Sequence, residues 1–199
     1  MAESAYAATG PLLAAVCGTL DPFAIAAWTA ICQVLATWIP ANAVVNPGLM
    51  VATAPGVVSG LGTVTLGNTP AVLGPLLALA AGSPPTDAFA IARWTIVATH
   101  IYTEWNTNIT VQGSTFVAVP TTGGPITGVA SLVLTAPLLG GLLAASMATD
   151  AVGIAIWLLI GTTMEAQFIT LGASAAIPLP IGLTSPSGGG PLAVSGTIL

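Results

Sequence analysis

The chain of 199 residues has six acidic side chains and one basic side chain, and only 4% of its residues are charged while 55% are hydrophobic. Soluble domains ordinarily carry about 25% charged residues. Nucleic-acid binding needs several Lys or Arg side chains to neutralise phosphates, so a single basic residue argues against nucleic acid as a partner. Two classes remain: a membrane protein, or a protein whose surface is covered by neighbouring subunits.

Two stretches approach the length of a membrane-spanning helix, over residues 23–39 and 152–168. A spanning helix needs about 20 consecutive apolar residues, so both are short. The N-terminus reads Met-Ala-Glu-Ser, which places an acid where a secretory signal has positive charge, so no signal peptide is expected. Cys17 and Cys32 are too few for a disulfide scaffold and are expected to be small buried side chains.

One segment occurs three times along the chain, and it organises the whole sequence. It reads Asp-Pro-Phe-Ala-Ile-Ala-Ala-Trp from Asp21, and ungapped copies begin at Asp87 and Asp150, after intervals of 66 and 63 residues. A Pro-Leu-Leu motif precedes each copy. Anchors that recur in the same order indicate repeats of one structural unit. The chain is therefore divided into an N-terminal tail and three repeats: 1–10, 11–66, 75–134 and 137–199.

Each repeat is expected to start with a short helix at the proline of its Pro-Leu-Leu motif, because proline is favoured at the first helical position. A longer helix then follows the repeated Asp. A carboxylate at that position accepts the free N–H groups of the first turn and lies at the positive end of the helix dipole. The expected N-caps are Asp21, Asp87 and Asp150.

The longer helix has an apolar stripe with the spacing of an amphipathic helix. The residues 4, 7 and 14 positions after each Asp are expected to form the repeat core: Ile25, Trp28, Leu35, Ile91, Trp94, Ile101, Ile154, Trp157 and Met164. A small residue stands at offset 11 in each copy, as Cys32, Ala98 or Gly161. We expect a close packing contact against the helix at this point, for example from the same helix of another copy.

β-branched residues follow the longer helix, with partial alternation over 109–119 and again over 127–134 after a turn at 121–125. Each unit is therefore expected to be two helices followed by a β-hairpin. The fold class expected is α+β with three internal repeats. Units of this size leave apolar side chains uncovered. We expect the copies to close around a pseudo-threefold axis, with an open solenoid as the alternative.

Arg93, His100 and Glu104 share one side of the second copy's longer helix. They could be half of a metal or acid–base site, or a polar patch that contacts a partner. The other copies have Val34 and Thr163 where this one has His100. A zinc site would need further His or Cys ligands. The sequence therefore predicts a partner contact here, and no catalytic residue, metal site or cofactor.

The pattern Asp-x-Phe-Ala-x-Ala-x-Trp-Thr, followed by Thr-Val-x-Gly at 110–113 and closing runs rich in Gly, Thr and Ser, resembles the small accessory structural proteins of tailed bacteriophages. The resemblance implies a protein that binds a symmetric assembly, as a capsid decoration or cement protein or as a neck, tail or baseplate component. Its implied partners are capsid or tail subunits, and its implied location is the virion, after synthesis in the host cytoplasm. The alternative is a small oligomeric protein embedded in, or associated with, a membrane. No enzymatic activity is expected.

Overall fold

The structure is a computed structural model that describes residues 8–46, 51–53, 57–59, 61–67, 69–112, 124–125, 129–174, 177–178, 184–185, 190–191 and 196–197. These residues form two compact units, each taken from three stretches of the chain. The helical unit takes Met1–Trp38, Asn68–Glu104 and Ala136–Phe168. The sheet unit takes Ile39–Gly67, Trp105–Thr135 and Ile169–Leu199.

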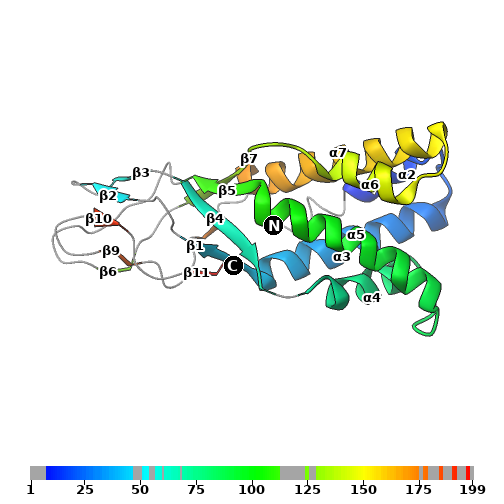
Figure 1. Cartoon of the computed structure of the whole chain (residues 1–199), viewed down its shortest axis with the longest axis horizontal. Helices are drawn as coiled ribbons and strands as arrows, with labels where there is room; N and C mark the ends of the chain where they lie inside the picture. Colours follow the sequence, from blue (N-terminus) through cyan, green and yellow to red (C-terminus); the bar gives the residue numbers. More distant parts are fainter. Residues whose placement is uncertain are drawn as a thin grey trace. The chain divides into compact units, whose positions relative to one another are not determined.

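Short and long helices alternate along the described chain (Figure 1). The short helices are α2 (Thr9–Val16), α4 (Pro70–Ala80) and α6 (Leu139–Met147). The long helices are α3 (Pro22–Asn42), α5 (Ala88–Thr107) and α7 (Ala151–Ser174). A helix pair therefore recurs at three places, each with a turn between the short and the long helix.

The short helices do not begin at the prolines from which they were expected to start. Helix α2 begins at Thr9, two residues before Pro11. Helix α4 begins at Pro70, which takes the favoured first position, and Pro75 lies inside the helix. The ends of α2 and α4 are set by Gly18 and Gly82, with φ values of +73° and +87°, in the left-handed region that favours glycine.

The turn before each long helix is held by the carboxylate of the repeated Asp. Each carboxylate accepts, at Oδ1, a hydrogen bond from a backbone N–H in the first turn of the helix. The bonds measure 3.0 Å from Phe23 to Asp21, 3.0 Å from Ala90 to Asp87 and 2.8 Å from Gly153 to Asp150. This is the hydrogen-bond geometry of an N-cap, and it fixes where each long helix begins.

Replacing Asp150 by Ala removes the acceptor of the Gly153 N–H, and we expect the free energy of unfolding to fall by about 0.5–2 kcal/mol. Asp150→Asn retains a capping oxygen and is expected to stay close to wild type, because Asn and Asp cap about equally well. Urea unfolding followed by circular dichroism measures both changes. An equal loss in the two variants would mean that the charge, rather than the capping bond, stabilises this turn.

Glycines allow the short and long helices of each pair to cross closely. A Cβ on Gly140 of α6 would lie 2.7 Å from the carbonyl oxygen of Leu158 in α7, and a Cβ on Gly161 would lie 2.9 Å from the carbonyl carbon of Leu139. The other two pairs have similar contacts, Gly10 with Thr29 and Gly74 with Thr95. Gly161 of α7, 11 positions after Asp150, thus packs against α6, the short helix of the same pair. The expected contact with the long helix of another copy was wrong for this residue.

The core of the helical unit lies deeper along the long helices than their first turns. The residues at offset 14, Leu35, Ile101 and Met164, are all buried. The other expected core residues are only half-buried: Ile25, Trp28, Ile91, Trp94 and Trp157. Ile154 is 49% exposed, so its assignment to the core was wrong. It lies in the first turns of α7.

The sheet unit has one larger antiparallel sheet with the strand order β11-β1-β4-β5-β7-β8. Its longer strands are β1 (Ala43–Asn46), β4 (Leu61–Leu66), β5 (Ile109–Gln112) and β7 (Val129–Leu134), and two-residue strands lie at its edges, β8 (Ile177–Pro178) and β11 (Gly196–Thr197). The register places Val45 opposite Val64 and Ile109 opposite Leu134. The remaining strands form two smaller sheets: β10 (Gly190–Pro191), β2 (Val51–Thr53) and β3 (Val57–Ser59); and β6 (Gly124–Pro125) with β9 (Thr184–Ser185).

The expected α+β fold of three repeats, each with two helices and a β-hairpin around a pseudo-threefold axis, is wrong. Helix predominates among the described residues, and strands pair between the expected repeats, β4 with β5 and β11 with β1. In the third repeat, β8 and β11 lie at opposite ends of the strand order, so these two strands form no hairpin.

Proline accounts for one of these short strands, because Pro178 at the end of β8 has no N–H to donate to a neighbouring strand. Part of the expected hairpin, residues 113–123, lies outside the described residues, as does most of the closing run 193–199. The boundaries of the three repeats stay a prediction.

Candidate functional site

Helix α6 is the element on which the polar side chains of the helical unit converge. Three residues of α5 contact it at different points along its length. Nη2 of Arg93 donates to the carbonyl oxygen of Met147 at 3.1 Å, Nε2 of His100 lies 2.9 Å from Oγ of Ser146, and Oε1 of Glu104 accepts from the N–H of Leu138 at 3.4 Å. The structure therefore brings Arg93, His100 and Glu104 together, against α6 of the same chain. Their expected contact with another protein stays a prediction.

These contacts match the charge distribution along α6. Its C-terminal carbonyl at Met147 meets the cation Arg93, and its N-terminal N–H groups meet carboxylates. The second carboxylate belongs to Glu165 of α7, whose Oε1 accepts from the N–H of Leu139 at 2.6 Å. Acids near a helix N-terminus and cations near its C-terminus are stabilising. Three of the few charges in the chain thus hold one short helix in place.

Glu104 and Glu165 are buried, with 0% and 3% of their surfaces exposed. Burial raises the pKa of Glu165, the N–H of Leu139 acts in the opposite direction, and the charge of Glu104 raises this pKa further. The sequence analysis missed Glu165 as part of the site. The available signal was an isolated acid in an otherwise apolar helical stretch.

Among the described residues, the remaining titratable side chains show no arrangement suited to nucleophilic chemistry. Burial raises the pKa of the Cys32 thiol to about 12, and burial also raises the pKa of Cys17, against a hydrogen bond with Trp28. A thiol with a raised pKa is a poor nucleophile, because the thiolate is the reactive form. Burial lowers the pKa of His100. Within the described part of the chain, no three His, Cys, Asp or Glu side chains form a group that could hold a metal ion.

An open groove of about 490 Å³ lies between α3 and α4. Its lining is Ala30, Gln33, Val34, Thr37, Leu76, Leu79 and Ala80. None of these side chains titrates, and the hydroxyl of Thr37 donates to the carbonyl oxygen of Gln33 in the same helix at 3.0 Å. The groove can offer apolar packing and the Gln33 amide, but no acid–base chemistry.

Large apolar side chains are exposed over much of the helical unit. They are Leu12, Leu20, Phe23, Val72, Leu76, Leu79, Phe89, Ile96, Leu138, Val152, Ile154, Leu158 and Leu159. Scattered exposed leucines are ordinary on soluble proteins, but large contiguous apolar patches are rare and mark interaction surfaces. Here almost no charged side chain separates them, because the whole chain has only seven.

Exposed threonines on the long helices direct their hydroxyls back to their own backbone. Thr99 donates to the carbonyl oxygen of Thr95 at 2.8 Å, and Thr162 donates to that of Leu158 at 3.0 Å. Such i−4 bonds use the hydroxyl proton within the helix. When another surface covers these threonines, few hydrogen bonds from their hydroxyl protons to water are lost.

Two helical windows are long and apolar enough to cross a membrane, Pro22–Ile39 and Ala151–Phe168. They agree closely with the stretches identified in the sequence. Length and composition alone do not distinguish a membrane span from the core helix of a soluble protein, and the first window also lies near the N-terminus, as a signal sequence would. No protein-family model, curated protein or solved structure matches the chain, so its function is argued from its own surface and contacts.

Proposed function

We propose that the chain is a non-enzymatic structural component of a bacteriophage virion, where it binds capsid or tail subunits as a decoration, cement, neck, tail or baseplate protein. The observation that carries the proposal is the outer surface of the helical unit, which exposes large apolar side chains with few charges between them. A surface of this kind gains free energy when a partner covers it. The sequence resembles phage accessory proteins, and this supports other virion subunits as the partner that covers the surface.

The use of the polar side chains supports an assembly role over a catalytic one. Arg93, Glu104 and Glu165 each bond to backbone groups of α6, which is a structural use of charge. The His100 ring lies against Ser146 of the same helix, at a position where the other repeats have no titratable side chain. These side chains orient a helix inside the protein.

A membrane-associated protein is the second candidate, and the windows Pro22–Ile39 and Ala151–Phe168 favour it. In that case the exposed apolar side chains would contact lipid instead of protein. Both candidates require that the exposed apolar side chains be covered. Protein subunits cover them in the first candidate, and lipid covers them in the second.

Fractionation of cells that make the full chain together with phage particles separates the two candidates. We expect the chain to be recovered without detergent and to co-sediment with capsid or tail particles in a density gradient. Recovery only from the membrane pellet, with strict dependence on detergent, would overturn the virion proposal in favour of the second candidate. A detergent-free chain that is absent from purified particles would overturn it as well.

A further inference from the structure

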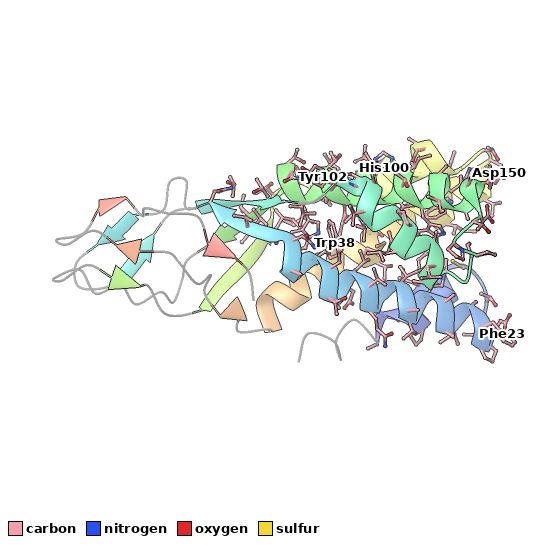
Figure 2. All side chains as sticks on the ribbon, turned by 90° about the horizontal axis from the view of Figure 1, so that it is seen from below. Phe23, Trp38, His100, Tyr102 and Asp150 are labelled. Atoms are coloured by element: carbon pink, nitrogen blue, oxygen red, sulfur yellow. The ribbon has the colours of Figure 1, made fainter. Side chains whose placement is uncertain are left out.

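The three turns between short and long helices lie at the same end of the helical unit (Figure 1). Figure 2 shows Phe23 and Asp150, which belong to two of these turns, at that end. The rings of Trp28 and Trp94 meet edge to face with centroids 6.1 Å apart, which joins the second turns of α3 and α5. The bond from Arg93 to Met147 joins α5 to the turn before α7. The N-terminal ends of the long helices are thus neighbours.

Each turn exposes an apolar side chain two positions after its capping Asp. Phe23, Phe89 and Val152 are 84%, 76% and 70% exposed. Leu20, beside the first cap, is exposed too. Side chains this exposed contribute little to packing within the helical unit, so the fold itself does not explain their apolar character. The tip surface is defined as these four residues and the three caps: Leu20, Phe23, Phe89, Val152, Asp21, Asp87 and Asp150.

The tip surface combines apolar side chains with three carboxylates, each of which accepts one backbone N–H at Oδ1. Its three carboxylates are half of the acids in the chain, and Asp21 and Asp150 are exposed. The chain has one Lys or Arg, Arg93, whose guanidinium donates to Met147, so the chain itself can neutralise at most one of these carboxylates. The capping bonds are made by Oδ1. A partner that supplies cations beside an apolar area would complement this surface.

This charge argues for a protein partner over a lipid surface. Proteins that bind membrane surfaces place Lys and Arg beside their apolar side chains, because cytoplasmic leaflets are negative. The tip surface has the opposite sign. In protein interfaces, a few aromatic side chains carry much of the binding energy, and complementary charges set orientation and partner choice.

We propose that the tip surface is the docking site for a partner protein that presents an apolar patch bordered by Lys or Arg side chains. The inference rests on the proposed virion function and names the contact surface and the chemistry of the partner. Phe23 and Phe89 insert into the apolar patch, and the three carboxylates pair with the basic border.

Three full-length variants test this assignment. Phe23→Ser with Phe89→Ser removes the two exposed rings. Asp21→Asn, Asp87→Asn and Asp150→Asn together remove the charges while each position retains a capping oxygen. The control is Ala71→Ser with Thr99→Ser, which changes exposed residues of α4 and α5 that belong neither to the tip surface nor to the exposed large apolar side chains. Circular dichroism and thermal unfolding establish that each variant is folded.

Fluorescence anisotropy measures the binding of two labelled peptides, one of alternating Leu and Lys and one of alternating Leu and Glu. We expect the Leu/Lys peptide to bind the wild type and the control with similar affinity. We expect the double Phe variant to bind this peptide at least about tenfold more weakly. The triple Asn variant is expected to lose most of the salt dependence of binding. Equal binding of the Leu/Glu peptide, or unchanged affinity in both tip variants, would overturn the proposal. So would Phe23- and Phe89-dependent binding to phosphatidylcholine/phosphatidylserine vesicles.

Incorporation into phage particles provides a second measurement. The tip variants are expected to be depleted from particles relative to the wild type and the control. Normal incorporation of both tip variants would overturn the docking assignment. A wild-type chain that is absent from particles would overturn the virion proposal, while the peptide titration would still decide the chemistry of the tip surface.

Discussion

Gly140→Ala is expected to destabilise the helical unit, whereas Gly141→Ala, one residue further along α6, is expected to stabilise it. In a helix interior, Ala is favoured over Gly by about 0.5–1 kcal/mol, and in the first turn of α6, where Gly140 and Gly141 lie, we expect a smaller preference of the same sign. At position 140 the added Cβ would lie 2.7 Å from the carbonyl oxygen of Leu158, and at position 141 it would meet nothing within 4 Å. Overpacking a close contact costs about 1–3 kcal/mol, so repulsion outweighs propensity at the first position only.

The pair of variants separates packing from helix propensity, because the residue change and the helix are the same. Urea unfolding of both proteins, followed by the circular dichroism of the helices, gives the two free-energy changes with opposite signs. The contact at Gly140 involves backbone, which cannot move away as the end of a flexible side chain can. Stabilisation by both substitutions would show that α6 and α7 are not in close contact at this crossing.

Replacing Glu165 by Leu is expected to cost about 1–3 kcal/mol of unfolding free energy, because the N–H of Leu139 loses its acceptor in a buried site. Glu165→Gln retains a side-chain oxygen for that N–H and removes the repulsion from Glu104, so it is expected to be at least as stable as the wild type at neutral pH. Thermal unfolding at a fixed pH compares the three proteins. A loss in Glu165→Gln as large as that in Glu165→Leu would show that the negative charge itself holds α6.

The raised pKa of Glu165 also sets the direction of a pH effect. The folded state binds this proton more tightly than the unfolded chain does, whose carboxyl titrates near 4.5. Its contribution to stability is therefore complete below that pH and is lost as the pH rises through the higher folded pKa. As the pH rises above about 4.5, the wild type should therefore lose stability relative to Glu165→Gln. A constant difference between the two proteins over this range would contradict the shift.

Local chemistry in the sequence indicated a short and a long helix in each repeat and the Asp before each long helix, but not the residues at which the short helices begin. An Asp followed by an apolar stripe carries its information within one or two helical turns. Burial in the first turns of the long helices could not be predicted in the same way. An apolar stripe shows which face of a helix is apolar, but not how far along the helix another element covers that face. Ile154 belongs to the same stripe of α7 as the buried Met164 and is nevertheless exposed.

The sheet and the charged contacts on α6 depend on residues that are distant in sequence. Strand β4 pairs with β5 across the boundary between two expected repeats, and a local pattern of β-branched residues does not specify that partner. Glu104 and Glu165 meet at the start of α6 although they come from different long helices and stand at different offsets from their caps. Comparing the repeats shows that each acid has no acidic equivalent in the other copies, but it does not show that Glu104 and Glu165 lie close together in the fold.

The threonines that bond to their own helices have a consequence for how temperature affects assembly. A surface whose hydroxyl protons are already engaged, such as those of Thr99 and Thr162, releases water without exchanging many hydrogen bonds. Association through such a surface near room temperature is driven mainly by the entropy of released water and weakens on cooling. Under the virion function proposed above, we therefore expect particles to shed the chain in the cold and to retain it in sulfate, which strengthens apolar burial.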